Sequence, residues 1–227
     1  MSDWNNFLIN ARRSLFSQAY THGLFIERIM LEVPRGRKVL EAGCGLGYLS
    51  RILADCGYNV TAGDIDEEVL KTAKLAIQNN ACSVNFITLD LFSLSDNFPE
   101  NAFDLIVHSG VMEHFSDEEI IMAFSQQKKV SKTLIFKVPN IRTRMTKQHF
   151  GNERFLSNAD WINLLKKGGY KDVKVFGGES APLWVKFFPA ILQEFPKYGR
   201  SSRVNAFLAR VALWRRYVSR HSIFVCN

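Results

Sequence analysis

Short apolar stretches and longer amphipathic stretches alternate along most of this chain, which predicts alternating strands and helices. Apolar runs rich in β-branched residues predict strands at 39–42, 60–63, 84–89, 103–109 and 133–138. Apolar residues at helical spacing predict helices at 48–56, 66–78, 117–130 and 158–167. This alternation is typical of an α/β fold, in which a parallel sheet carries crossover helices on both faces.

The two ends of the chain depart from the alternation. Residues 4–31 predict one or two helices, which we expect to cover one end of the sheet. Further strands are predicted at 172–176 and 222–226, and the segment between them is too long for a hairpin loop. Apolar residues recur there at helical spacing and predict a helical insertion: Val204, Phe207, Leu208, Val211, Trp214 and Val218. We therefore expect a single domain over 1–227, made of a helical cover (1–36), an α/β core (37–180), a basic helical insertion (181–220) and a final strand (221–227).

The composition agrees with one globular domain. A chain of 227 residues with 47% hydrophobic and 22% charged residues is typical of a soluble α/β protein. It has no apolar run of about eighteen residues that would span a membrane, and its first residues lack the pattern of a secretory signal. The four cysteines are widely separated and none stands at metal-ligand spacing. They predict reduced thiols in a cytoplasmic protein without a metal site.

Positive charge is concentrated near the end of the sequence. The net charge is +7, and residues 182–227 contain eight basic residues against one acid, so this segment alone accounts for the excess. One interpretation of its helical stripe is a helix packed on the core; the other is a basic amphipathic helix that lies on a membrane surface or contacts a lipid-like substrate. The second predicts a peripheral contact with the inner membrane surface through residues 200–220. A general affinity for nucleic acid would spread the charge more evenly, so no nucleic-acid partner is expected.

Three alternating glycines follow the first predicted strand. Gly43, Gly45 and Gly47 remove side chains where the backbone must turn sharply, so that a ligand can lie against the peptide. The helix predicted after them points unpaired N–H groups toward the same place. The sequence therefore predicts a small-molecule site at the end of the first strand.

Acidic residues end the next two predicted strands. Asp64 comes about 20 residues after the glycines, where the ribose hydroxyls of a nucleoside ligand need an acceptor. Asp66 is better explained as the N-cap of the next helix. Asp90 ends the third strand, where a carboxylate could accept from the amino group of an adenine. A nicotinamide dinucleotide is disfavoured, because its fingerprint requires glycine or alanine where this chain has Tyr48.

Together these blocks closely resemble the class I S-adenosylmethionine-dependent methyltransferases, particularly the small-molecule branch that includes quinone-biosynthesis enzymes. The resemblance covers about residues 37–177 and rests on blocks in the family's order: Glu41-Ala42-Gly43-Cys44-Gly45-Leu46-Gly47, Ala62-Gly63-Asp64-Ile65, Asp90-Leu91, Phe103-Asp104-Leu105-Ile106-Val107 and Val111-Met112-Glu113-His114-Phe115. It implies a Rossmann-like, doubly wound, seven-stranded and mostly parallel sheet whose last strand is antiparallel. It also implies S-adenosylmethionine as cofactor and S-adenosylhomocysteine as product.

The resemblance implies roles for the residues of the glycine loop. Gly43, Gly45 and Gly47 would pass beside the methionine and ribose portions of the cofactor. Glu41 would help hold the methionine end, and Asp64 would accept both ribose hydroxyls.

It also implies roles on the adenine side and near the methyl group. Asp90 would meet the adenine amino group, and Leu91 and Ile65 would contact the two faces of the ring. A place in the core is nearly as good an explanation for Leu91 and Ile65. Ser109 would border the sulfonium.

Methyl transfer from a sulfonium is a direct displacement, so the protein chiefly aligns the acceptor and excludes water. A hydroxyl acceptor profits from a general base, for which His114 and His149 are candidates and His22 is a third. The alternative for His114 is a surface or helix-capping histidine. The predicted function is methylation of a small-molecule or lipid-like acceptor, and basic residues in the loop after the fifth strand suit an anionic one: Arg142, Arg144, Lys147 and Arg154.

Two other functions stay open at this level. The chain could bind S-adenosylmethionine as a scaffold protein without turnover, because a fold does not fix a function. It could also methylate nucleic acid, although the Asn/Asp-Pro-Pro-aromatic tetrad of base-modifying relatives is replaced by Ser109-Gly110-Val111-Met112.

Overall fold

A computed structural model describes residues 6, 8, 15–77, 83–140, 152–177 and 221–227, with only the backbone given for 15–20. Within these residues, seven strands form one sheet in the order β3-β2-β1-β4-β5-β7-β6. The strands are β1 (Lys38–Ala42), β2 (Asn59–Asp64), β3 (Val84–Thr88), β4 (Phe103–Ser109), β5 (Ser131–Pro139), β6 (Val173–Gly177) and β7 (His221–Cys226). All neighbours pair in parallel except β7, which is antiparallel to both β5 and β6. The predicted Rossmann-like sheet with an antiparallel last strand is confirmed.

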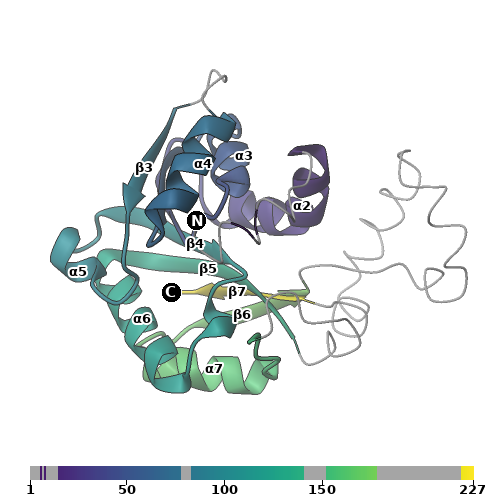
Figure 1. The fold of residues 1–227 in the computed structure, drawn as a ribbon. Helices are drawn as coiled ribbons and strands as arrows, with labels where there is room; N and C mark the ends of the chain where they lie inside the picture. The colour runs from purple at the N-terminus through teal and green to yellow at the C-terminus, as the bar shows by residue number, and fades with distance from the viewer. Residues whose placement is uncertain (1–5, 7, 9–14, 78–82, 141–151, 178–220) are drawn as a thin grey trace, which may run out of the picture.

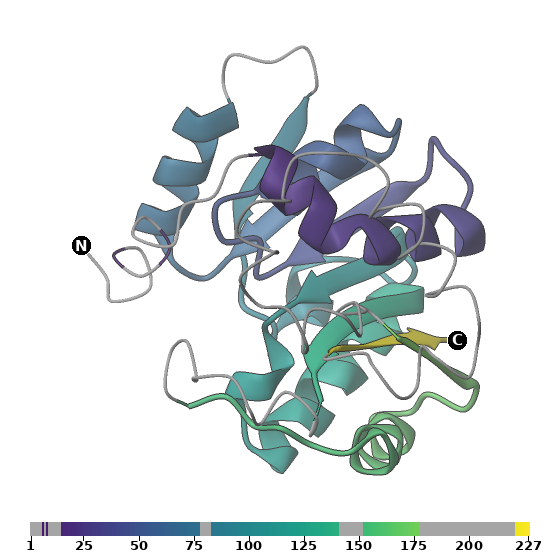
Figure 2. The same ribbon diagram turned by 90° about the vertical axis from the view of Figure 1, so that its right-hand side faces the viewer.

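Helices cover both faces of the sheet (Figure 1). One face carries α2 (Leu15–Glu32), α3 (Tyr48–Asp55) and α4 (Glu67–Ile77), and the other carries α5 (Leu94–Asn97), α6 (Asp117–Val130) and α7 (Asn158–Lys167). Figure 2 shows the same division from the side, with α2 and α7 on opposite sides of the sheet. A short 3-10 turn, η1 (Met112–His114), connects β4 to α6.

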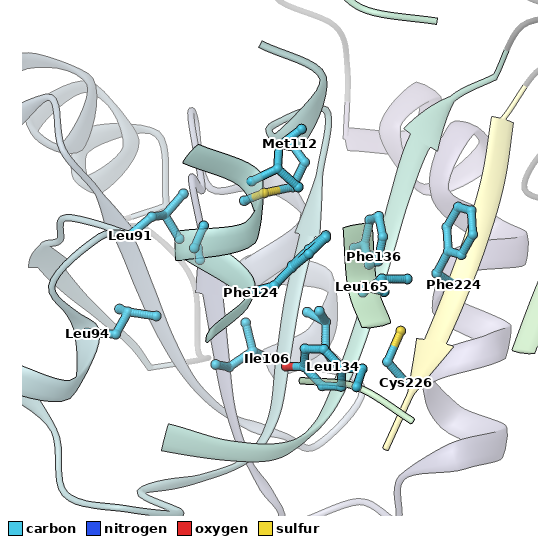
Figure 3. Close-up of a cluster of buried hydrophobic side chains, with 14 of the residues drawn as sticks. Leu91, Leu94, Ile106, Met112, Phe124, Leu134, Phe136, Leu165, Phe224 and Cys226 are labelled. Atoms are coloured by element: carbon cyan, nitrogen blue, oxygen red, sulfur yellow. The ribbon is translucent and has the colours of Figure 1, made fainter. Parts of the chain in front are cut away.

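Two apolar layers hold the helices to the sheet. On the α6 and α7 face, the Phe136 ring stacks on the Phe224 ring with centroids 4.9 Å apart (Figure 3). The Phe136 ring also meets the Trp161 ring edge-on at 5.8 Å. On the other face, Phe25 and Ile29 of α2 pack with residues of α3, β1, β4 and β5. Since both faces are covered, the central strands are mostly apolar, with Glu41, His108 and Lys137 as buried exceptions.

The N-terminal cover lies elsewhere than expected. We expected it over one end of the sheet, but α2 packs on a face beside α3, because its apolar residues Phe25, Ile26 and Ile29 meet side chains of the strands. The insertion predicted over 181–220, and with it the membrane contact through 200–220, lies outside the described residues. In the part of the chain that is described, no helix is long and apolar enough to cross a membrane.

Candidate functional site

The glycine loop between β1 and α3 turns through left-handed backbone. Gly43, Gly45 and Gly47 have φ values of 75°, 52° and 73°, which other residues rarely adopt. A Cβ on Gly43 would lie 2.7 Å from Cγ2 of Val111, and one on Gly47 would lie 2.9 Å from Cδ1 of Ile77. The loop therefore needs glycine for its path at all three positions, and for space at the first and last.

The sheet order puts this loop at a topological switch point. From β1 the chain passes through α3 on one face to β2, and from β4 it passes through α6 on the other face to β5. Open α/β sheets bind ligands outside the carboxyl ends of the strands at such a point. The contact between Gly43 and Val111 shows that the two connections meet there.

Asp64 ends β2 and reaches the glycine loop. Its Oδ2 accepts a hydrogen bond from the N–H of Gly45 at 3.0 Å, and its Oδ1 accepts from the N–H of Asp66 at 3.1 Å. Burial raises the pKa of Asp64, and these backbone bonds oppose the rise. Asp66 is the N-cap of α4 as predicted, since its Oδ1 accepts from the N–H groups of Glu68 and Val69.

Glu41 lies behind the loop, in the interior. The side chain is 4% exposed on β1, and its Oε2 accepts a hydrogen bond from the hydroxyl of Ser50 in α3. Burial raises the pKa of Glu41 to about 8, and the charge of Asp64 adds to the rise. A carboxyl group with this pKa is mostly protonated at pH 7.

The residues expected around an adenine ring differ in exposure. Ile65 is 68% exposed beyond β2, so its side chain can meet a ligand. Leu91 is 8% exposed within the core cluster of the α6 face, which agrees with the core alternative (Figure 3). Asp90 is half-buried, and its Oδ1 accepts from the N–H of Phe92 at 2.9 Å, in the turn after β3.

The residues that follow β4 border the switch point opposite the glycine loop. Ser109 is half-buried, and Gly110 after it has φ 75° and donates its N–H to the Lys137 carbonyl of β5. In the η1 turn Met112 points into the core. His114 is half-buried and ends the η1 turn, three residues after the Val111 side chain that contacts the glycine loop.

His114 is held from a distant part of the chain. Its Nδ1 lies 2.6 Å from Oδ1 of Asn152, and the cap of α6 is Ser116, whose hydroxyl accepts from the N–H of Glu119. His114 therefore does not cap α6, whereas its exposed contact with Asn152 agrees with the alternative of a surface histidine. His149 lies outside the described residues, and His22 lies on α2 with Nδ1 3.4 Å from Nζ of the buried Lys137.

Sequence reasoning assigned no role to Glu113, which lies in the η1 turn with its Oε1 beside Gly110. Its side chain is 4% exposed, and its Oε2 has no hydrogen-bond partner within the described part of the chain. Burial raises the pKa of Glu113 to about 8, with a further rise from Glu153 and a small opposing effect of Lys137. The acid beside His114 was visible in the sequence, but its burial depends on strands that are distant along the chain.

A metal site is not seen here: among the described residues, no three histidine, cysteine or acidic side chains are grouped to hold an ion.

Comparison with known proteins agrees with this geometry. Residues 39–133 match the family model described as a methyltransferase domain. The chain is similar to the ubiquinone biosynthesis O-methyltransferase of Idiomarina loihiensis, with 26% identity over 188 residues that cover 74% of this chain and 72% of that protein.

Solved structures share the fold. A SAM-dependent methyltransferase from Archaeoglobus fulgidus superposes with a TM-score of 0.64 at 16% identity, covering 99% of each chain. The magnesium protoporphyrin IX methyltransferase of Synechocystis with bound SAM gives a TM-score of 0.56 at 19% identity, covering 92% of this chain and 77% of that one.

Proposed function

We propose that this chain, which belongs to the class I S-adenosylmethionine-dependent methyltransferases, methylates a hydroxyl oxygen of a small molecule by direct displacement. The observation that carries the proposal is the left-handed glycine loop, which opens between the carboxylate of Asp64 and the turn that bears His114. A ligand placed against Gly43 and Gly45 would have a ribose acceptor on one side and a proton acceptor on the other.

The cofactor roles proposed for single residues rest on which acceptor atoms and apolar surfaces are available to a ligand. The N–H groups of Gly45 and Asp66 donate to different oxygens of Asp64, and the carboxylate keeps acceptor capacity for a ribose hydroxyl. Exposed Ile65 would cover one face of the adenine, and Asp90 would offer Oδ2 to its amino group. Glu41 would act from behind the loop, and Ser109 would border the sulfonium.

When bound, S-adenosylmethionine supplies an electrophilic methyl group and leaves as S-adenosylhomocysteine. The work left to the protein is to orient the acceptor, to exclude water and to remove one proton. In this proposal the neutral ring of His114 takes that proton from the acceptor hydroxyl at Nε2.

The acceptor class is inferred from the relative and from a buried cation. The similar protein of Idiomarina loihiensis is an O-methyltransferase of ubiquinone biosynthesis, which suits a small phenolic acceptor with a lipid-like part. Lys137 is 4% exposed near the end of β5, where its Nζ reaches Thr21 and His22 of α2. A basic side chain near this edge of the sheet suits an acceptor with an acidic group. We also propose a cytoplasmic protein whose basic 200–220 segment makes a peripheral membrane contact.

The test of this function is transfer of a labelled methyl group. The protein is incubated with S-adenosylmethionine labelled in the methyl group and with catechol, a carboxylated catechol, an alkylated catechol and the matching anilines. We expect label in the catechols, most of all in the carboxylated or alkylated ones, and little in the anilines. Label found in RNA, or cofactor binding without transfer to any compound of a cell extract, would contradict it.

The cofactor site is tested separately by calorimetry. Asp64→Ala should weaken S-adenosylmethionine binding by about 1–3 kcal/mol, the range of a charge-assisted pair of hydrogen bonds. Asp66→Asn is the matched control, because asparagine also caps a helix and this residue lies outside the proposed contact. Equal affinity of Asp64→Ala and the unchanged protein would refute the ribose role.

A further inference from the structure

Residues 152–154, which we call the strap, lie alongside the η1 turn. The N–H of Arg154 donates to the carbonyl of Glu113 at 2.9 Å. The guanidinium of Arg154 donates to the carbonyl of Phe115 at 2.6 Å and pairs with Asp117 at 2.5 Å. The strap thus binds the turn on both sides of His114, which fixes the backbone that carries the ring.

The fourth contact reaches the imidazole itself. The Oδ1 atom of Asn152 lies 2.6 Å from Nδ1 of His114. With Oδ1 as the amide atom nearer the ring, Asn152 accepts the hydrogen bond, and the neutral ring then carries its proton on Nδ1. Nε2 then keeps its lone pair, because the bond at one ring nitrogen decides which state the other has.

We infer that Asn152 is a positioning residue that sets both the orientation and the tautomer of His114, so that Nε2 faces the acceptor as the proton acceptor. The inference rests on the function proposed above and extends it to a residue 38 positions away in the sequence. A neutral amide suits this task, because it orients the ring without adding charge beside the cationic cofactor.

The tautomer can be measured without turnover. In protein labelled with nitrogen-15, long-range proton–nitrogen NMR spectra distinguish a protonated from an unprotonated ring nitrogen, and His114→Gln identifies the signals. We expect protonated Nδ1 and unprotonated Nε2 in the unchanged protein, and a loss of this bias in Asn152→Leu. Asn85→Leu, at an exposed position of β3, is the matched control and should keep the bias. A protonated Nε2 in the unchanged protein would overturn the inference.

Kinetics test the same bond through its consequence. Asn152→Leu should lower kcat about tenfold or more, within the contribution of a general base, with the KM for S-adenosylmethionine unchanged. Asn152→Asp keeps an acceptor and adds a negative charge, so kcat should recover while the acid limb of the pH–rate profile moves to higher pH. The ionisable groups of the elements that meet here stay the same in both variants: Glu113, Asp117, Lys137, Glu153 and Arg154.

The two proposals fail in different ways. A protein that shows the expected tautomer but methylates no hydroxyl compound would refute the proposed function and leave the bond between Asn152 and His114 intact. Turnover that is equal in Asn152→Leu and in the unchanged protein, with the same pH profile, would refute the positioning role alone.

Discussion

At the scale of single residues, the loop between β1 and α3 needs glycine for two different physical reasons, backbone conformation and space. Gly45 is required by its backbone, since a Cβ there would meet Leu8 only at an ordinary 3.5 Å. Gly43 is required by its backbone and by space, because the connection after β4 presses against it through Val111. The contact with Val111 links the glycine loop to the β4–α6 connection that carries His114. A substitution at Gly43 should therefore disturb both segments.

Gly43→Ala should therefore lower the free energy of unfolding by about 1–3 kcal/mol, the cost of a strained backbone with a steric contact. Urea unfolding measures it. Gly23→Ala is the matched control: Gly23 lies in α2 with nothing within 4 Å of an added Cβ, so the change should stabilise the helix by about 0.5–1 kcal/mol. Equal stability changes in the two variants would contradict the strain argument.

At the scale of elements, two attachments hold the connection from β4 to α6. A capping box starts α6, in which Ser116 and Glu119 bond each other's backbone N–H groups. Just before it, the strap holds the η1 turn through Arg154. The turn itself is too short to be stable alone, so its shape depends on these two attachments.

Arg154→Ala should lower stability by about 1–2 kcal/mol, because it removes a charge-assisted bond to the carbonyl of Phe115 and the pair with Asp117. Arg37→Ala is the control, since Arg37 forms a more exposed pair with Asp104, at 3.4 Å, and such a pair contributes little. Thermal unfolding compares them. Activity should fall only in Arg154→Ala, and a larger loss of stability in Arg37→Ala would contradict the role of the strap.

The same elements show what a sequence can reveal. The strands and long helices were predictable, because burial on one or both faces leaves a periodic pattern. The η1 turn and the four-residue α5 are too short to leave one. Leu91 and Ile65 both follow strand ends, and only the packing of the α6 face buries the first and leaves the second exposed. The contact between His114 and Asn152 joins distant segments, so no local pattern predicts it.

At the scale of the whole molecule, covering both faces of the sheet buries ionisable groups of the central strands and their connections, and burial shifts the pKa of three of them strongly. His108 of β4 is fully buried and stacks on Phe136, and burial lowers its pKa to about 3. Burial raises the pKa of Glu41 and of Glu113 to about 8. The folded protein thus keeps all three neutral at pH 7, whereas the unfolded chain ionises the two acids.

This difference makes stability depend on pH with a definite sign. Between their unfolded pKa of 4.5 and their folded pKa of about 8, the two acids hold protons only in the folded state, so stability falls as pH rises. Each contributes a slope of about 1.4 kcal/mol per pH unit. His108 acts oppositely below its unfolded pKa of 6.5, where the unfolded chain binds the extra proton and stability falls as pH falls.

Glu113→Gln should therefore gain stability relative to the unchanged protein as pH rises from 5.5 to 7.5, by about 1.4 kcal/mol per pH unit, because glutamine stays neutral in both states. Urea unfolding at three pH values in this range measures the difference. Glu119→Gln is the opposite case, because hydrogen bonds to Ser116 lower the pKa of Glu119. The stabilisation that ionised Glu119 contributes is therefore fully present at pH values above its unfolded pKa of 4.5. Its difference from the unchanged protein should stay constant over the same range. Parallel curves for Glu113→Gln and the unchanged protein would show that Glu113 is ionised in the folded protein over this range, which would contradict the prediction.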